Sequence, residues 1–170
     1  MYLEKAKNEF YELLNLVEPS FYYEPCSLED VQEVREILKL PIPAVYEEFL
    51  LWIGNGSDFS DPFSIGHCSK RNTNLQKVAL EIMNDNGTSE ILPEDAIVFV
   101  IPEENCSFAF IRASEGSNPP IHFFPGFMEG EDGKYRTVHH FIWNWFPNLE
   151  ELCIAWIEDY MALALGFIER

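Results

Sequence analysis

The sequence predicts an α+β fold, in which an antiparallel sheet of about four to six strands is flanked by helices. Up to about residue 84, apolar residues recur at three- and four-residue steps, which is typical of amphipathic helices. From residue 96 to about 138, short apolar runs alternate with turn sequences, which is typical of a strand meander. A last helical pattern follows. Helices, then strands, then a helix indicate the α+β class.

Two amphipathic helices are expected near the N-terminus. The first covers residues 3–17 and ends before Pro19. Ser27 is a good N-cap for the second helix, and Asp30 three residues later gives a near capping box with a shorter acid. The apolar stripe of this helix reaches Leu38.

Two more helices are expected before the strands begin. The first runs from about residue 43 to 52 and ends at residues 54–56, Gly-Asn-Gly, which tolerate a positive φ. Residues 57–74 are weakly patterned, and a helix is expected from 74 to about 84.

Short strands are expected in the second half of the chain. Turn sequences separate the first three of them, and residues 125–133 are expected to form a loop before the fourth. The expected strands cover residues 96–101, 107–112, 121–124 and 135–138.

The last helix begins near Asn148, which can cap it, and Glu150 in its first turn favours the positive end of the helix dipole. An aromatic-rich segment, residues 141–146, precedes it and contains Trp143 and Trp145. These rings have two interpretations. They form the floor on which the last helix packs, with one tryptophan partly exposed, or they form an exposed hot spot for a partner.

The size of the chain fits one well-cored domain. At 19.7 kDa, a folded chain buries about 70% of the surface that it exposes when unfolded. The N-terminal turn is polar, and no run of about 18 uncharged apolar residues occurs, so we expect a cytoplasmic protein without a membrane segment. The four cysteines are scattered without a C-x-x-C motif, and we expect reduced, mostly buried thiols.

The charge balance excludes several classes of function. The chain has 29 acidic residues against 11 Lys and Arg, a formal net charge of −18. A protein that binds nucleic acid or an anionic membrane directly needs clustered basic residues. Residues 78–133 hold eleven acids and one base, Arg112. Solubility asks for a net charge of about 2–8 in magnitude, so we hypothesise a cationic partner.

No catalytic, cofactor-binding or metal-binding motif is recognised. The sequence contains no G-x-S-x-G, P-loop or dinucleotide-binding pattern. The adjacent His139 and His140 point apart in a helix or a strand, so they cannot chelate one metal together. We therefore expect no cofactor and no metal, and a metal-dependent hydrolase with grouped carboxylates remains only as a third hypothesis.

Residues 26–56 resemble the opening of the SUKH superfamily, the Smi/Knr-like domain. The resemblance rests on an acidic helix start, a leucine–proline step, a tyrosine with Phe-Leu on the next helix, and an Asn-Gly stop. These features lie at residues 27–31, 38–41, 45–50 and 54–56. The later strands and the aromatic segment with its helix fit the sheet and closing helix of the family, so the resemblance covers most of residues 26–160.

Two departures from the family pattern occur. Glu103-Glu104-Asn105 stands where the family often has an Asp-Gly turn. Residues 1–25 look like an added N-terminal helix and connector, so we expect a single SUKH-like domain over residues 1–170.

The resemblance implies a non-enzymatic protein. Many bacterial members are immunity proteins that neutralise a cognate toxin, often a nuclease, and eukaryotic members are regulatory interaction modules. Our first hypothesis is an immunity-type protein, monomeric or weakly dimeric, that occludes a basic toxin surface with acidic side chains. The candidate acids are Asp58, Asp61, Glu103, Glu104, Glu115, Glu129, Glu131 and Asp132. The alternative is a regulatory module that binds its partner through Trp143 and Trp145.

Overall fold

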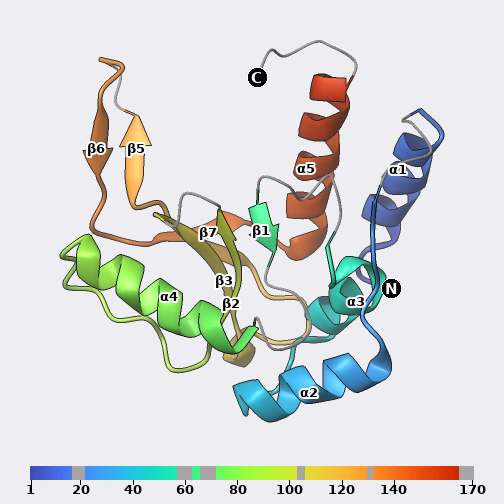
Figure 1. Ribbon diagram of the computed structural model, residues 1–170, viewed down its shortest axis with the longest axis horizontal. Helices are drawn as coiled ribbons and strands as arrows, with labels where there is room; N and C mark the ends of the chain where they lie inside the picture. The colour runs from blue at the N-terminus through green and yellow to red at the C-terminus, as the bar shows by residue number, and fades with distance from the viewer. Residues whose placement is uncertain (17–21, 57–62, 66–71, 103–105, 130–131, 165–170) are drawn as a thin grey trace.

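The protein combines five α-helices with two antiparallel sheets in the described part of the chain (Figure 1). The structure is a computed structural model, and it describes residues 1–16, 22–56, 63–65, 72–102, 106–129 and 132–164. The helices are α1 (Glu4–Leu14), α2 (Leu28–Leu38), α3 (Ala44–Ile53), α4 (Asn72–Asp85) and α5 (Leu149–Ala164), with a short 3-10 helix η2 (Ala113–Glu115). The strands are β1 (Phe63–Ile65), β2 (Ala96–Pro102), β3 (Phe108–Arg112), β4 (Ile121–Phe124), β5 (Phe127–Glu129), β6 (Tyr135–Thr137) and β7 (Ile142–Phe146).

The main sheet has five antiparallel strands in the order β1-β2-β3-β4-β7. Strands β5 and β6 pair with each other in a separate hairpin. In Figure 1 this hairpin projects away from the main sheet, on the side opposite α1. The expected α+β class with an antiparallel sheet and flanking helices is confirmed.

Both faces of the main sheet are covered by helices, which produces two hydrophobic cores. One core joins the sheet to α1, α3 and α5, and the other joins it to α4. Strand β2 serves both cores, since Phe99 packs into the first and Val98 into the second. A strand that is buried on both faces needs apolar residues throughout. This explains the continuous apolar run in β2.

Helix α1 is part of the core rather than an external arm. Leu3 and Phe10 are fully buried, and the Phe10 ring meets the Trp52 ring of α3 edge-on at 5.3 Å between centroids. The Glu150 carboxylate of α5 accepts the backbone N–H of Lys5 at 2.8 Å. A carboxylate at a helix N-terminus satisfies an unpaired amide and stabilises the helix dipole. This bond therefore ties the first turn of α1 to α5.

The predicted start of α2 is confirmed in atomic detail. The Asp30 amide donates to the Ser27 hydroxyl oxygen at 3.1 Å, and the Asp30 carboxylate accepts the Ser27 amide at 2.8 Å. The hydrogen bond from the Ser27 hydroxyl, with that from its amide, lowers the pKa of Asp30 below its usual value. Both partners of the capping box lie within four residues, so the sequence alone could predict it.

Three expectations about the strands are corrected. Residues 135–137 form a strand, β6, as expected. However, β6 pairs with β5, which lies within the stretch 125–133 that was expected to be a loop. The segment 142–146, which was not expected to be a strand, is the edge strand β7 of the main sheet, and its Phe146 also packs against the core to which α5 belongs. Residues 63–65, in a weakly patterned stretch, form the opposite edge, β1. Strand pairing depends on residues distant in the sequence, and local periodicity does not report it.

The cysteines differ from the expectation of reduced thiols at one described position. Cys26 takes part in a disulfide, whereas Cys153 is a thiol that is fully buried. Burial, with a smaller contribution from the nearby Glu150 carboxylate, raises the pKa of the Cys153 thiol. Cys68 lies outside the described residues. Within the described helices, none has the length and apolar character needed to cross a membrane.

Candidate functional site

Strand β7 is an irregular edge strand. Ile142 lies opposite Phe123 of β4, and Phe146 lies opposite Ile121, so the five residues 142–146 of β7 lie along only three residues, 121–123, of β4. The extra length is absorbed at Asn144, whose φ of 54° lies in the left-handed region. An asparagine tolerates this conformation better than most residues do. The result is a bulge in the middle of the edge strand.

The buried side chain of His122 on β4 holds this bulge. His122 is only 1% exposed, and its Nδ1 atom accepts the backbone N–H of Asn144 at 3.1 Å. Its Nε2 atom lies 2.8 Å from the Glu115 carboxylate. Because an amide can only donate, Nδ1 is the acceptor and Nε2 carries the proton that is donated to Glu115. The neutral Nε2–H form of the imidazole satisfies both contacts.

Glu115 is fixed from its other side by a polar network. The Arg112 Nη1 atom lies 3.8 Å from the Glu115 carboxylate, and the Arg112 Nε atom lies 3.0 Å from the Asp95 carboxylate. The Ser114 amide also donates to Asp95 at 3.1 Å. Partial burial tends to raise the pKa of Asp95, but the hydrogen bonds from Ser114 and Arg112 outweigh it and lower the pKa. The acids of this network are thus committed to internal partners.

The bulge places the two tryptophans of β7 on opposite faces of the sheet. The Trp143 ring meets His122 at 4.9 Å and Phe110 at 6.0 Å, on the face that α4 covers. The Trp145 ring stacks on Phe123 at 4.4 Å and 22°, on the other face. A regular strand would place residues two apart on one face. Both rings remain accessible, since Trp143 is 47% exposed and Trp145 is 36% exposed.

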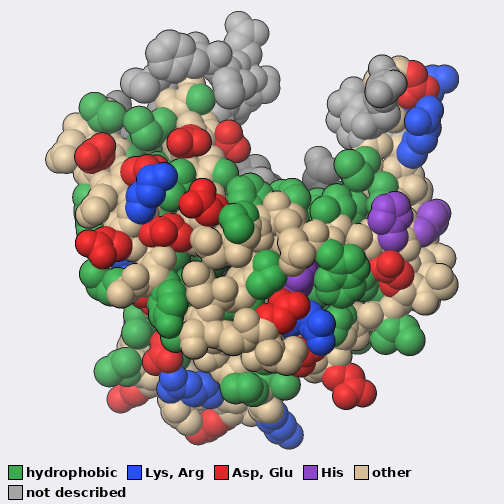
Figure 2. Space-filling model, turned by 180° about the vertical axis from the view of Figure 1, so that it is seen from behind, with side chains coloured by type: hydrophobic (Ala, Val, Ile, Leu, Met, Phe, Trp, Pro, Cys, Tyr) green, Lys and Arg blue, Asp and Glu red, His purple; other side chains and the backbone are tan. Residues whose placement is uncertain are grey.

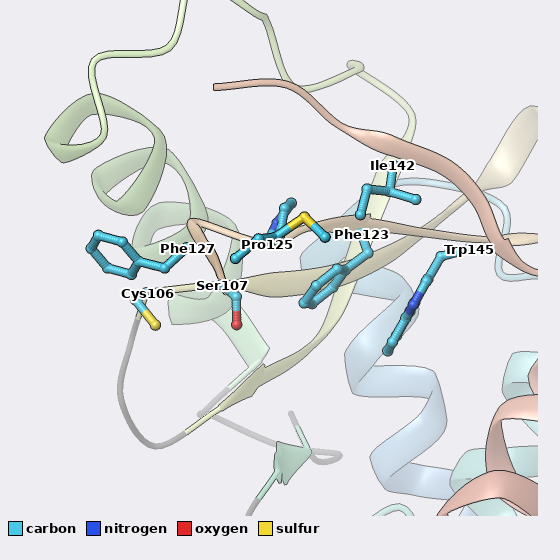
Figure 3. A pocket seen from close by; sticks show the side chains of 8 residues that line it. Cys106, Ser107, Phe123, Pro125, Phe127, Ile142 and Trp145 are labelled. Atoms are coloured by element: carbon cyan, nitrogen blue, oxygen red, sulfur yellow. The ribbon is translucent and has the colours of Figure 1, made fainter. Parts of the chain in front are cut away.

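An open groove of about 760 Å³ lies beside Trp145, between β7, β4 and the β5–β6 hairpin (Figure 3). We call it the β7 groove. In Figure 3, Trp145 and Phe127 lie at its two ends, with Phe123 and Pro125 between them. Its lining residues are mostly apolar: Cys106, Ser107, Phe123, Pro125, Phe127, Met128, Ile142 and Trp145.

The hairpin that forms one wall of the β7 groove is anchored by Gly126. Gly126 has a φ of 59°, and a Cβ atom there would lie 1.6 Å from the Cys106 carbonyl oxygen, so only glycine fits. The Gly126 carbonyl accepts the Val138 amide at 2.8 Å, which closes the base of the hairpin. Beyond this point, Phe127 and Met128 are each 48% exposed. Figure 2 shows the hairpin standing off from the body, with hydrophobic side chains on the surface at its base.

Comparison with known protein families places this fold. The family model of the SMI1 / KNR4 family (SUKH-1) matches residues 25–147. The chain belongs to the SMI1 / KNR4 family (SUKH-1). A comparison with curated proteins gave no match. The family is generally non-catalytic, and membership is consistent with an immunity-type function in general.

The family match contains the β7 groove but not the whole core. It ends after β7, so α5 lies outside it, as does α1 at the other end. The expected division, with residues 1–25 added to a single SUKH-like domain over residues 1–170, stays a prediction. Because α1 is buried in the first core, this SUKH-1 chain uses its N-terminal helix to complete that core.

The candidate acids do not form one described surface. Five of them lie outside the described residues: Asp58, Asp61, Glu103, Glu104 and Glu131. Glu129 ends β5. Glu115 is held by His122 and Arg112, and Asp132 pairs with Arg136 at 2.9 Å. In the view of Figure 2, acidic side chains occur over most of the molecule and are most numerous on the side away from the projecting hairpin. Their role in binding stays a prediction.

The structure connects some candidate residues and separates others. Glu115 and Trp143 meet at His122, whereas Trp145 faces the β7 groove on the other side of the sheet. Phe127 and Met128 were not predicted as site residues, because they fell in a stretch expected to be a loop. The Pro-Gly step just before Phe127 was the available signal, since such a pair marks a turn that starts a hairpin.

No metal centre is evident in the part of the chain that the structure describes. That part contains no group of three or more His, Cys, Asp or Glu side chains able to hold a metal ion. His139 and His140 are exposed neighbours just before β7. Among the described residues, the aromatic edge strand and the β7 groove form the candidate functional site.

Proposed function

We propose that this SUKH-1 protein is a non-enzymatic immunity protein that binds a cognate cationic toxin and covers the toxin's active surface. The observation that carries the proposal is the net charge of −18 in a member of a family consistent with immunity function. The partner is then a basic protein, of which a nuclease is an example, and not a nucleic acid.

Electrostatics give this charge a physical role. A nuclease holds phosphates with Lys and Arg side chains in a groove. An acidic protein can occupy that groove and exclude the nucleic acid. Opposite net charges also raise the association rate, and salt screens this effect over a Debye length of about 8 Å at physiological ionic strength. Fast capture matters, because a toxin acts until it is bound.

A co-expression experiment tests the proposal. The probe is a candidate basic toxin, such as a nuclease domain, expressed in a bacterial host with and without this chain. We expect growth arrest by the toxin alone and rescue by co-expression. The purified pair should form a complex whose association slows as salt rises. A complex that does not form, or rescue that does not occur, would remove the proposal.

The exposed tryptophans of β7 favour one alternative, a regulatory module that binds a neutral or mixed partner. Tryptophan is enriched among residues that dominate binding energy at interfaces. Under this alternative, reversing the charge of Glu129 and Asp132 leaves binding intact, while Trp143→Ala or Trp145→Ala weakens it. Under the first proposal, binding depends on the acidic charge and therefore on ionic strength.

A further inference from the structure

We propose that the β7 groove is the docking site for an extended segment of the cationic partner, in which an apolar side chain is flanked by Lys or Arg. The inference rests on the proposed function and deepens it, because it names the surface and the chemistry of the segment. The occupant is a strand-like segment of the toxin rather than a second copy of this chain.

The lining of the β7 groove fits an apolar side chain. Phe123 and Ile142 form its floor on adjacent strands, opposite each other in the register. Trp145 at one end and Phe127 at the other are partly exposed. The volume of about 760 Å³ is more than one side chain fills and lies within the range of about 300–1,000 Å³ for ligand pockets. An extended segment can place alternate side chains into such a groove.

The Trp145 ring offers a second kind of contact. Phe123 stacks on the ring at 4.4 Å and Phe146 meets it edge-on at 4.7 Å, so the indole is held in a fixed orientation. The ring nevertheless stays 36% exposed. An exposed tryptophan face attracts the ammonium of Lys and the guanidinium of Arg. A cationic side chain beside the inserted apolar one therefore gains from the same residue.

The charge of the neighbouring chain complements a cationic segment. The stretches 103–107 and 123–132, which supply most of the lining, contain five acids and no Lys or Arg. Glu129 directly follows the lining residue Met128, and consecutive Cα atoms are about 3.8 Å apart, so its backbone lies beside the groove. Asp132 already pairs with Arg136, and Lys134 is the other basic residue of the hairpin. The balance remains acidic.

The bulge at Asn144 supplies an internal control. Trp143 and Trp145 have similar exposure but lie on opposite faces of the sheet, and only Trp145 lines the β7 groove. A segment that binds in the groove must perturb Trp145 and leave Trp143 unchanged. A general affinity of the acidic surface for cations would perturb both rings alike.

The experiment uses end-blocked synthetic peptides and the full-length, isotope-labelled protein. The probe is Lys-Arg-Phe-Arg-Lys, and the controls are Lys-Arg-Ala-Arg-Lys and Glu-Glu-Phe-Glu-Glu. The indole N–H signals of the tryptophans are followed by nuclear magnetic resonance during each titration. We expect the probe to shift the Trp145 signal, saturably, while the Trp143 signal stays in place. Trp145→Ala should weaken binding by roughly tenfold or more, and Trp143→Ala should change it less than about twofold.

Each other result overturns the inference. Equal shifts of both indoles, equal effects of the three peptides, or no shift at the solubility limit exclude the proposed segment. A Trp145 signal that moves with protein concentration instead shows that a second copy occupies the groove. The toxin rescue separates this inference from the proposed function. If the Trp145→Ala variant protects cells as well as the unchanged protein does, the groove is not the site, although the function stands. If the unchanged protein does not protect, the proposed function itself fails.

Discussion

Replacing His122 with phenylalanine tests the network that shapes β7. His122→Phe keeps an aromatic ring between Phe110 and Trp143 but removes the acceptor of the Asn144 amide and the donor to Glu115. The Asn144 amide is partly buried at this bond, and leaving it unpaired costs about 1–3 kcal/mol. The lost bond to the partly exposed Glu115 carboxylate adds about 1 kcal/mol, because water can replace part of it.

We therefore expect His122→Phe to lower the free energy of unfolding by about 2–4 kcal/mol. For a chain of this length, that corresponds to a fall in Tm of about 5–15 °C. Urea unfolding followed by circular dichroism gives the free energy, and differential scanning calorimetry gives the Tm. The indole signal of Trp143 should shift as well, because the ring at 4.9 Å from it has changed.

The matched control is His139→Phe. His139 is exposed just before β7, so this variant should change stability by no more than about 0.5 kcal/mol. Replacing a buried polar group with an apolar one of similar shape can be neutral when its hydrogen-bond partners are replaced too. In His122→Phe the Asn144 amide and the Glu115 carboxylate both remain, so a cost is expected. A His122→Phe protein that is as stable as the His139→Phe protein would refute the assigned role of His122.

Further predictions concern the hairpin, the polar network and the N-terminal helix. Gly126→Ala should lower stability by more than about 2 kcal/mol in urea unfolding, because its Cβ would overlap the Cys106 carbonyl oxygen; an unchanged midpoint would contradict the hairpin geometry. The lowered pKa of Asp95 means that its carboxylate stabilises the fold above the unfolded pKa of about 3.9, and that this stability is lost as the pH falls through the folded pKa. Asp95→Asn should therefore destabilise by about 1 kcal/mol at pH 7, and its difference from the unchanged protein should shrink as the pH falls below the unfolded pKa of about 3.9, as a pH series of urea unfolding would measure. Phe10→Ala should destabilise by about 3–5 kcal/mol in urea unfolding, and a value near zero would indicate that α1 is an external arm.

The sequence predicted those parts of the fold that depend on local chemistry. The capping box of Ser27 and Asp30 involves residues three apart, and the strand run of β2 needs only its own apolar residues. Partners distant in the chain were not predictable in this way. The residues 135–137 have the pattern of a strand. Their pairing outside the main sheet depends on β5 and on the turn at Gly126, which lie earlier in the chain.

The candidate site shows the same division. The aromatic segment was recognised from the sequence, and Trp143 and Trp145 were named as candidates. In a regular strand, however, residues two apart lie on the same face, so the pattern alone could not show that these two rings lie on opposite faces. The bulge that separates them depends on His122, which precedes Asn144 by 22 residues. The sequence also showed that residues 78–133 hold eleven acids against one base. It could not show that Glu115 is committed to His122 and Arg112 inside the fold.

The most direct test of the account is the association rate constant between this protein and a basic toxin that it neutralises in the rescue experiment, measured by stopped-flow fluorescence over a series of salt concentrations. The account predicts a rate that falls steeply as ionic strength rises, because a net charge of −18 attracts a basic partner at a distance. A rate that does not change with salt, or the absence of any complex, would contradict it.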